Sequence, residues 1–306
     1  MMKLFLSFSL VGALFSASAY DLLSDGAMAD VRFRVVDDRG VPVENVVATI
    51  CFQKTFTSSD VIDCQTDVNG ICAAKHSSIG EMRAYFKKDG YYETGLKPQF
   101  RQWDWKKAQD LRKWSDGTVD IPIVLKAKRN PIETVLHSVT FKPFPNTNEV
   151  VKLDLEMLEW CPPYGNGKHD DLHLVFDGWR NPLDWDDYHE HLRAVFPNAA
   201  DGFYRLKVEP FTAFPYAYAA DTNRVYEKSF AFRHVHTKAG ITESRRFAND
   251  EYLIYRVRTV TNELGEVTHA NYGRIGEKLG QYFGLSMKSW FNPTDNDPNL
   301  EDSRQF

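Results

Sequence analysis

Histidines spaced two apart are the residues of this sequence with the clearest potential for chemistry. Two His-x-His pairs occur, His189-Glu190-His191 and His234-Val235-His236. Residues two apart on a β-strand point to the same face, so His234 and His236 could hold one ion. Zinc usually takes a third protein ligand, for which His173, Asp171 and Asp177 are the choices. One divalent metal such as zinc, bound by His173, His234 and His236 in a metal-dependent hydrolase, is therefore one hypothesis.

A structural explanation of the same histidines competes with the metal. Phe230 and Phe232 share the alternating face of His234 and His236, so the imidazoles could simply continue a partly buried row. The segment 184–196 carries acids in a first turn and apolar residues on one side, which predicts a helix. His189 and His191 would then diverge by about 200°. Because the His-Glu-x-x-His signature of zinc proteases is also absent, the sequence favours a protein without a cofactor.

Carboxylates and tryptophans offer two further possibilities, both involving sugars. A glycosidase needs two carboxylates about 5 to 10 Å apart, which a sequence cannot show, and an acidic surface explains the same residues equally well. Exposed indole rings can stack on sugar rings, although large aromatic side chains are more often buried. The candidate carboxylates are Asp170, Asp171, Asp177, Asp184, Asp186, Asp187 and Glu190, and the candidate stacking residues are Trp103, Trp105, Trp179 and Trp185.

Motifs of nucleophilic and nucleotide chemistry are absent from the sequence. Neither Gly-x-Ser-x-Gly, Ser-x-x-Lys nor Gly-x-x-x-x-Gly-Lys occurs. Catalytic groups are assembled in space and not along the chain, so these absences lower the expectation of an enzyme without removing it. A net charge of −5, with no basic stripe, argues against nucleic acid as a partner.

The first nineteen residues have the pattern of an export signal. Lys3 supplies a positive charge, residues 4–15 are mostly apolar, and Ala17-Ser18-Ala19 forms a small-residue cleavage site. No later window approaches the roughly 20 apolar residues that a membrane-spanning helix needs. We expect an exported protein, periplasmic or extracellular, without a transmembrane segment.

Four cysteines in an exported chain allow disulfides. Cys51, Cys64 and Cys72 lie close together in the sequence, whereas Cys161 stands apart. We expect at most one bridge within this trio, and its pairing cannot be read from the spacing.

Alternation of apolar and polar residues predicts β-strands throughout residues 30–127. Val31, Phe33 and Val35 alternate with polar residues before an Asp-rich turn that ends at Gly40. The stretch 64–74, CQTDVNGICAA, places Asp67 and an Asn-Gly pair where a tight hairpin turn is expected. A calcium loop would need more oxygen side chains than this stretch provides.

The series DDRGVPVENVVATI, TDVNG, IGEMRAYFKKDGYY and VDIPIVLK resembles the carboxypeptidase regulatory-like domain. The resemblance implies a seven-stranded β-sandwich of the transthyretin type over residues 30–127. In metallocarboxypeptidases this module accompanies a zinc peptidase, but no histidine here has Glu three residues later. The insert 97–118, with Trp103, Trp105 and Trp114, departs from the pattern and could form a short helix.

Residues 131–306 are expected to form a second, β-rich α+β domain. The segments LKAKRNPI, EWCPPYGNGKHDDL and WFNPTDNDPNLE resemble features of uncharacterised exported bacterial proteins, which implies no activity. A hairpin is expected around residues 262–265, in addition to the helix at 184–196. The sequence thus predicts a mainly β, two-domain accessory or binding protein, with a glycan or a cell-envelope protein as its partner.

Overall fold

The computed structural model describes residues 26–98, 106, 108–209, 212, 214–244, 250–276 and 284–304. The predicted export signal and two of the candidate stacking residues, Trp103 and Trp105, lie outside these ranges. The described residues form mainly β-structure, which confirms the predicted fold class. Within the same ranges, no helix has the length and apolar character needed to cross a membrane.

The chain divides into two compact units. Unit 1 contains the described residues up to Lys128 together with those of Glu209–Pro215, and unit 2 contains Arg129–Val208 and Tyr216–Arg304. Unit 1 thus includes a short segment that is distant in sequence. Within unit 1 the ring of Phe214 stacks on Tyr92 at 4.8 Å, and Glu209 Oε1 lies 2.8 Å from Nζ of the buried Lys126.

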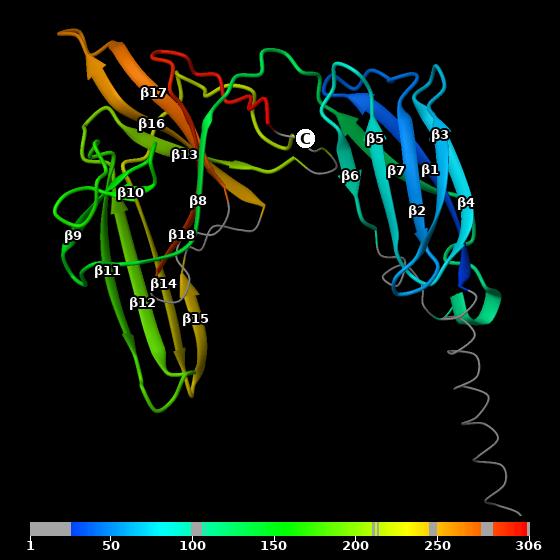
Figure 1. The fold of residues 1–306 in the computed structure, drawn as a ribbon, viewed down its shortest axis with the longest axis horizontal. Coiled ribbons are helices and arrows are strands. Elements are labelled where there is room, and N and C mark those ends of the chain that lie inside the picture. Colours follow the sequence, from blue (N-terminus) through cyan, green and yellow to red (C-terminus); the bar gives the residue numbers. More distant parts are fainter. Residues whose placement is uncertain are drawn as a thin grey trace, which may run out of the picture. The chain divides into compact units, whose positions relative to one another are not determined.

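Unit 1 is a β-sandwich with seven strands among its described residues (Figure 1). One sheet has the order β4-β1-β7 and the other the order β3-β2-β5-β6. The apolar faces of both sheets form one core, in which Phe33 and Phe86 meet edge to face at 5.0 Å. The strands are β1 (Ala27–Asp37), β2 (Val47–Gln53), β3 (Ser59–Gln65), β4 (Ile71–Ser78), β5 (Met82–Lys87), β6 (Thr94–Leu96) and β7 (Val119–Leu125). The predicted seven-stranded sandwich is therefore present, while membership of the carboxypeptidase regulatory-like family stays a prediction.

Three turns of the molecule share one local pattern, in which an Asp or Asn is followed three residues later by a glycine. The side chains of Asp37, Asp67 and Asn262 each accept two backbone N–H groups, at 2.8 to 3.0 Å. The glycine that closes each turn, Gly40, Gly70 or Gly265, has a φ of +70° to +80°. Such a φ is readily adopted only by glycine.

The turn at Asp67–Gly70 is confirmed, but the strands that it joins do not form a hairpin. β3 pairs with β2 in one sheet, whereas β4 pairs with β1 in the other. The turn therefore carries the chain from one sheet of the sandwich to the other. Both strands lie at the edges of their sheets, on one side of the sandwich.

The insert of unit 1 contains helical residues at 106 and 108–111. Trp114, which follows them, is only 1% exposed, and its indole N–H donates to Ser78 O at 2.8 Å. This tryptophan thus belongs to the core of its own sandwich.

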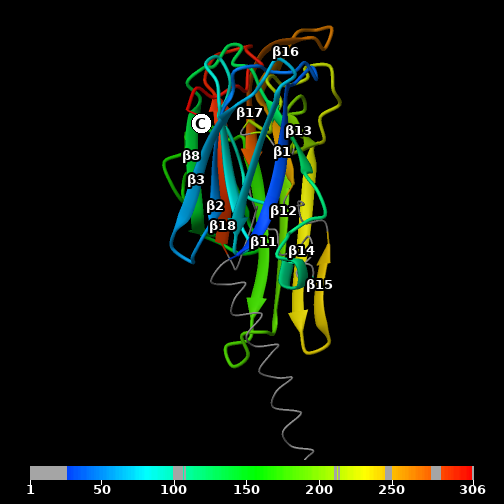
Figure 2. The same ribbon diagram turned by 90° about the vertical axis from the view of Figure 1, so that its right-hand side faces the viewer.

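Unit 2 has two sheets among its described residues. The six-stranded sheet has the order β10-β9-β11-β12-β14-β15, and the five-stranded sheet the order β13-β16-β17-β18-β8. Strands β11, β12 and β14 run side by side (Figure 1, Figure 2). The strands are β8 (Val135–Pro143), β9 (Val150–Asp154), β10 (Glu159–Trp160), β11 (Leu172–Arg180), β12 (Tyr188–Val195), β13 (Gly202–Lys207), β14 (Ser229–Thr237), β15 (Gly240–Ser244), β16 (Glu251–Thr261), β17 (Val267–Gly276) and β18 (Gly284–Asn292).

The helix predicted for residues 184–196 is wrong. Tyr188–Val195 is strand β12, which pairs with β11 on one side and with β14 on the other. Leu192, Ala194 and Phe196 are buried at alternate positions, which is the period of a strand. The hairpin expected around residues 262–265 is confirmed as the connection between β16 and β17.

A buried ion network joins the two sheets of unit 2. The guanidinium of Arg258 on β16 lies 3.1 Å from Asp171, 2.7 Å from Glu156 and 3.5 Å from Asp154. Burial raises the pKa of Asp171, against the effect of Arg258. Burial opposes ionisation of Asp154 too, but three backbone N–H groups and Arg258 lower its pKa below the ordinary value. Two of the three carboxyls around this guanidinium, those of Asp154 and Asp171, thus have pKa values shifted in opposite directions.

Candidate functional site

One face of the six-stranded sheet carries polar and aromatic side chains that remain accessible. On β11 and β12 the buried residues Leu174, Phe176 and Leu192 point to the core, and the residues between them point away from it. We call this second surface the open face and define it by its residues Asp177, Trp179, His189, His191 and Arg233. Cross-strand pairing sets Trp179 beside His189, and His191 between Asp177 and Arg233.

The centre of the open face is a pair of stacked rings. The ring centroids of Trp179 and His189 are 6.2 Å apart, with an interplanar angle of 24°. Trp179 is 48% exposed, and the carboxylate of Asp177 lies 3.6 Å from Nε2 of His189. Aromatic rings supply an apolar surface, while the imidazole and carboxylate supply hydrogen-bonding atoms at its rim. This combination can hold a ligand that is apolar on its flat side and polar around its edge.

Trp185 does not extend this surface, although it is 70% exposed. It lies in the connection between β11 and β12, and the guanidinium carbon of Arg180 is 4.3 Å from its ring centroid. Arg180 directly follows Trp179 on a strand, so the two side chains point to opposite faces. The two predicted tryptophans therefore belong to different surfaces.

His234 and His236 lie on the core side of the same sheet. Both rings meet the ring of Tyr188 edge-on, at 5.2 and 5.7 Å. Nε2 of His234 is 3.4 Å from the Tyr188 hydroxyl, and its Nδ1 is 3.9 Å from the buried carboxylate of Glu190. Phe230 and Phe232 continue the row and are buried. The structure thus supports the explanation in which these imidazoles extend a partly buried row.

The third predicted ligand, His173, is far from the other two. Register pairs His173 with Val195 and Val195 with Ser229, which is five residues from His234 along β14. Five residues of a strand span roughly 16 Å. His173 instead contacts Asp170 at 2.7 Å. The three histidines do not converge, and the described residues hold no cluster of three or more His, Cys, Asp or Glu side chains suited to a metal.

The alternative metal ligands Asp171 and Asp177 also lie away from the histidine pair. Asp171 is bound by Arg258 within unit 2, and Asp177 lies on the open face, away from His234. Asp177 and Glu190 point to opposite sides of the sheet, so these two carboxylates cannot flank one sugar.

Sequence reasoning did not name Arg233, and it set aside His189 and His191 as a pair that could not act together. The incorrect helix separated them by about 200°, whereas strand β12 places both on one side. The alternation of Leu192, Ala194 and Phe196 was the signal that could have identified the strand.

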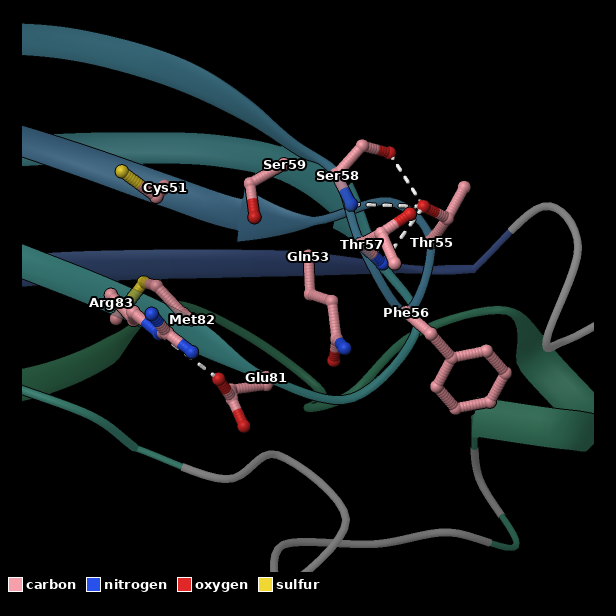
Figure 3. A pocket seen from close by; sticks show the side chains of 10 residues that line it. All are labelled: Cys51, Gln53, Thr55, Phe56, Thr57, Ser58, Ser59, Glu81, Met82 and Arg83. Carbon is pink, nitrogen blue, oxygen red and sulfur yellow. Dashed lines mark hydrogen bonds and ion pairs between the residues drawn. The ribbon is translucent and has the colours of Figure 1, made fainter.

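Unit 1 has a small polar cavity of about 140 Å³ on the outer side of its four-stranded sheet (Figure 3). Glu81 and Arg83 form an ion pair of 3.2 Å at its edge. Phe56, which is 76% exposed, projects from the loop between β2 and β3. The lining residues are Cys51, Gln53, Thr55, Phe56, Thr57, Ser58, Ser59, Glu81, Met82 and Arg83. Cys51 thus faces outward.

Comparison with known proteins gives only distant likenesses. No protein-family model and no curated protein matches the sequence. Among solved structures, a 3-chlorocatechol 1,2-dioxygenase from Rhodococcus opacus 1CP shares 13% identity, with a TM-score of 0.28 over 34% of this chain and 62% of its own. A DUF3823 family protein from Parabacteroides merdae shares 9% identity, with a TM-score of 0.23 over 91% of this chain and 100% of its own.

A third structure, a candidate carbohydrate binding protein from Bacteroides uniformis, shares 5% identity, with a TM-score of 0.21 over 88% of this chain and 98% of its own. The chain spans 62% and 58% of the two dioxygenases that it matches. At these TM-scores the likenesses carry no argument about the activity of this chain.

Proposed function

We propose that the protein is an exported, non-catalytic binding protein whose open face recognises a glycan of the cell surface or the surroundings. The observation that carries this proposal is the accessible stack of Trp179 and His189, with the Asp177 carboxylate 3.6 Å from the imidazole. Export rests on the leader-like first nineteen residues of the sequence.

The chemistry of the open face suits a sugar better than the other ligands considered. A pyranose ring presents C–H groups on its flat side and hydroxyls around its edge, which match an indole surface bordered by hydrogen-bonding groups. The net charge of −5 disfavours a polyanion. Because the rings belong to adjacent paired strands, their spacing is held by the sheet and not by a loop.

Binding to an array of bacterial cell-wall, plant and algal polysaccharides tests the proposal. We expect at least one polysaccharide to bind the full chain, and Trp179→Ala to weaken that binding at least about fivefold, since an aromatic contact contributes roughly 1 kcal/mol beyond its buried area. Trp185→Ala is the matched control, because it removes an exposed tryptophan from outside the open face and should leave affinity unchanged.

Three outcomes would contradict the proposal. The first is that no polysaccharide on the array binds. The second is that the double variant Trp103→Ala/Trp105→Ala abolishes binding that Trp179→Ala leaves intact. That result would place the site in the insert. Binding that disappears on chelation with EDTA and in His234→Ala/His236→Ala would instead support the metal-dependent hydrolase. The proposed binding requires no metal, so EDTA should not change the affinity.

A further inference from the structure

Cys64 and Cys72 face the same core from opposite sheets of unit 1. Cys64 on β3 pairs with the buried Ala48, and Cys72 on β4 pairs with the buried Phe33. Both sulfur-bearing side chains pack into the single apolar core of the sandwich. The two strands are joined by the tight turn at Asp67–Gly70, so the cysteines lie on either side of one reversal.

The two thiols are also within hydrogen-bonding reach of each other. The Cys72 thiol as donor lowers the pKa of Cys64, while burial works in the other direction. The pKa of Cys72 is raised by the same interaction and by burial. In such a pair the lower-pKa sulfur is the one that reacts first as a thiolate.

The other two cysteines have different surroundings. Cys51 is on the outer side of the four-stranded sheet, lining the small cavity of Figure 3, whereas Cys64 points inward. Cys161 belongs to unit 2, where its thiol donates to His169 O at 3.2 Å. Burial raises the pKa of Cys161 to about 11, which keeps it protonated.

We propose that Cys64 and Cys72 form a disulfide that ties the two sheets of the sandwich together at their shared edge. The oxidant is a disulfide of a thiol–disulfide oxidoreductase of the export compartment. The Cys64 thiolate attacks one sulfur of that disulfide, which forms a mixed disulfide and releases one partner thiolate. Cys72 then loses its proton and attacks Cys64 Sγ, which releases the second partner thiolate. Two electrons pass to the partner, which leaves as a dithiol.

Peptide mapping of the full, oxidised chain tests this pairing. Free thiols are alkylated under denaturing conditions, and the chain is cut on the N-terminal side of Asp. This places Cys64 in fragment 63–66 and Cys72 in fragment 67–88, because Asp63, Asp67 and Asp89 follow one another. We expect one species in which the two fragments are joined, and its loss after reduction. Cys51 and Cys161 should be alkylated throughout.

Two variants sharpen the result. Cys51→Ser should retain the joined fragments, and Cys64→Ser should make Cys72 fully available for alkylation. A fragment linked through Cys51, or alkylation of all four cysteines after incubation with an excess of a disulfide oxidant, would overturn the proposal. Mapping reads the covalent bond directly, so the test holds even where a variant is less stable.

Discussion

The two units differ in how completely their ion pairs are buried. In the sandwich of unit 1 the core is apolar, and a representative ion pair, Arg32 with Asp120, lies at the surface, with both side chains almost half exposed. In unit 2 the guanidinium of Arg258 is enclosed with two carboxylates, those of Asp154 and Asp171, that are almost completely buried. Apart from the buried Lys126, whose partner Glu209 is about half exposed, unit 1 relies on apolar burial and tight turns. Unit 2 also contains a buried polar network between its sheets.

Replacing Arg258 by Met should have the largest effect on stability. The change leaves two buried carboxylates without their cation, which costs about 3 to 5 kcal/mol of unfolding free energy. Urea denaturation of the full chain measures the lost free energy of unfolding. The unfolding of each unit is followed separately through its own tryptophans. The unit 2 transition should move to lower urea while the unit 1 transition stays.

Arg32→Met is the control for that experiment. It removes a cation from an ion pair of 2.5 Å that is exposed to solvent, where water replaces the lost contact. We expect at most a small shift of the unit 1 transition, far below the effect of Arg258→Met on unit 2. Equal shifts from Arg32→Met and Arg258→Met would refute the contrast between the units.

A smaller effect is expected from the turns, and there unit 1 is the more sensitive unit. A Cβ added at Gly70 would lie 2.2 Å from the carbonyl oxygen of Val35, and φ is +70°. A Cβ at Gly265 would meet nothing within 4 Å, at a φ of +79°. Gly265→Ala therefore carries only the conformational penalty, about 1 kcal/mol. Gly70→Ala adds a backbone clash, for roughly 2 to 4 kcal/mol in total.

Thermal unfolding of both glycine variants gives the comparison. In the Gly70→Ala protein the unit 1 transition should occur at a clearly lower temperature than in the native protein. In the Gly265→Ala protein the unfolding temperature of unit 2 should fall only slightly. A milder effect at Gly70 than at Gly265 would mean that the two turns are not held as described.

The smallest expected effect is a dependence of stability on pH. The pKa of Asp154 in the fold lies below its ordinary value of 3.8. Its ionisation therefore stabilises the fold above that value, and this contribution is lost as the pH falls through the lower folded pKa. Asp154→Asn should be less stable than the native protein at neutral pH, with a difference that shrinks on acidification.

Added salt separates the pH dependence due to Asp154 from that due to the exposed carboxylate of Asp120. The hydrogen bond from Arg32 lowers the pKa of Asp120 as well. Because salt screens exposed pairs more than buried ones, the pH dependence removed by Asp120→Asn should vanish in high salt, and that removed by Asp154→Asn should persist. Denaturation curves between pH 2 and pH 7 at two salt concentrations would measure both. These pH limits bracket the ordinary carboxyl pKa of about 4.

Local patterns allowed the strands and turns to be predicted, because their causes are local. Alternation predicted strands in unit 1, such as the one that contains Val31, Phe33 and Val35. The Asp67–Gly70 and Asn262–Gly265 turns follow from side chains that bond their own backbone. The prediction failed at residues 184–196 because acids before an apolar stretch favour a helix start. In the structure, Asn181 and Asp184 each accept a backbone N–H of the β11–β12 connection instead.

The ion network of unit 2 could not have been predicted in the same way. Arg258 is 87 residues from Asp171 and sits at a φ of +58°, where the pairing of β16 with β17 shifts register. Such a bulge redirects a side chain, but the hydrophobic pattern of the sequence does not reveal it. The open face has the same origin, since Asp177, Trp179 and His189 become neighbours only through strand pairing.

The assignment of Glu209–Pro215 to unit 1 has a consequence for how the protein can be divided. A chain ending at Lys128 would lack Phe214 and Glu209, and with them the ring stacked on Tyr92 and the carboxylate that neutralises the buried Lys126. Cleavage after Lys128 by a protease should therefore produce fragments that stay associated until denaturant is added. The smallest self-sufficient form of the sandwich is one in which a distant loop is supplied in trans or grafted back onto it.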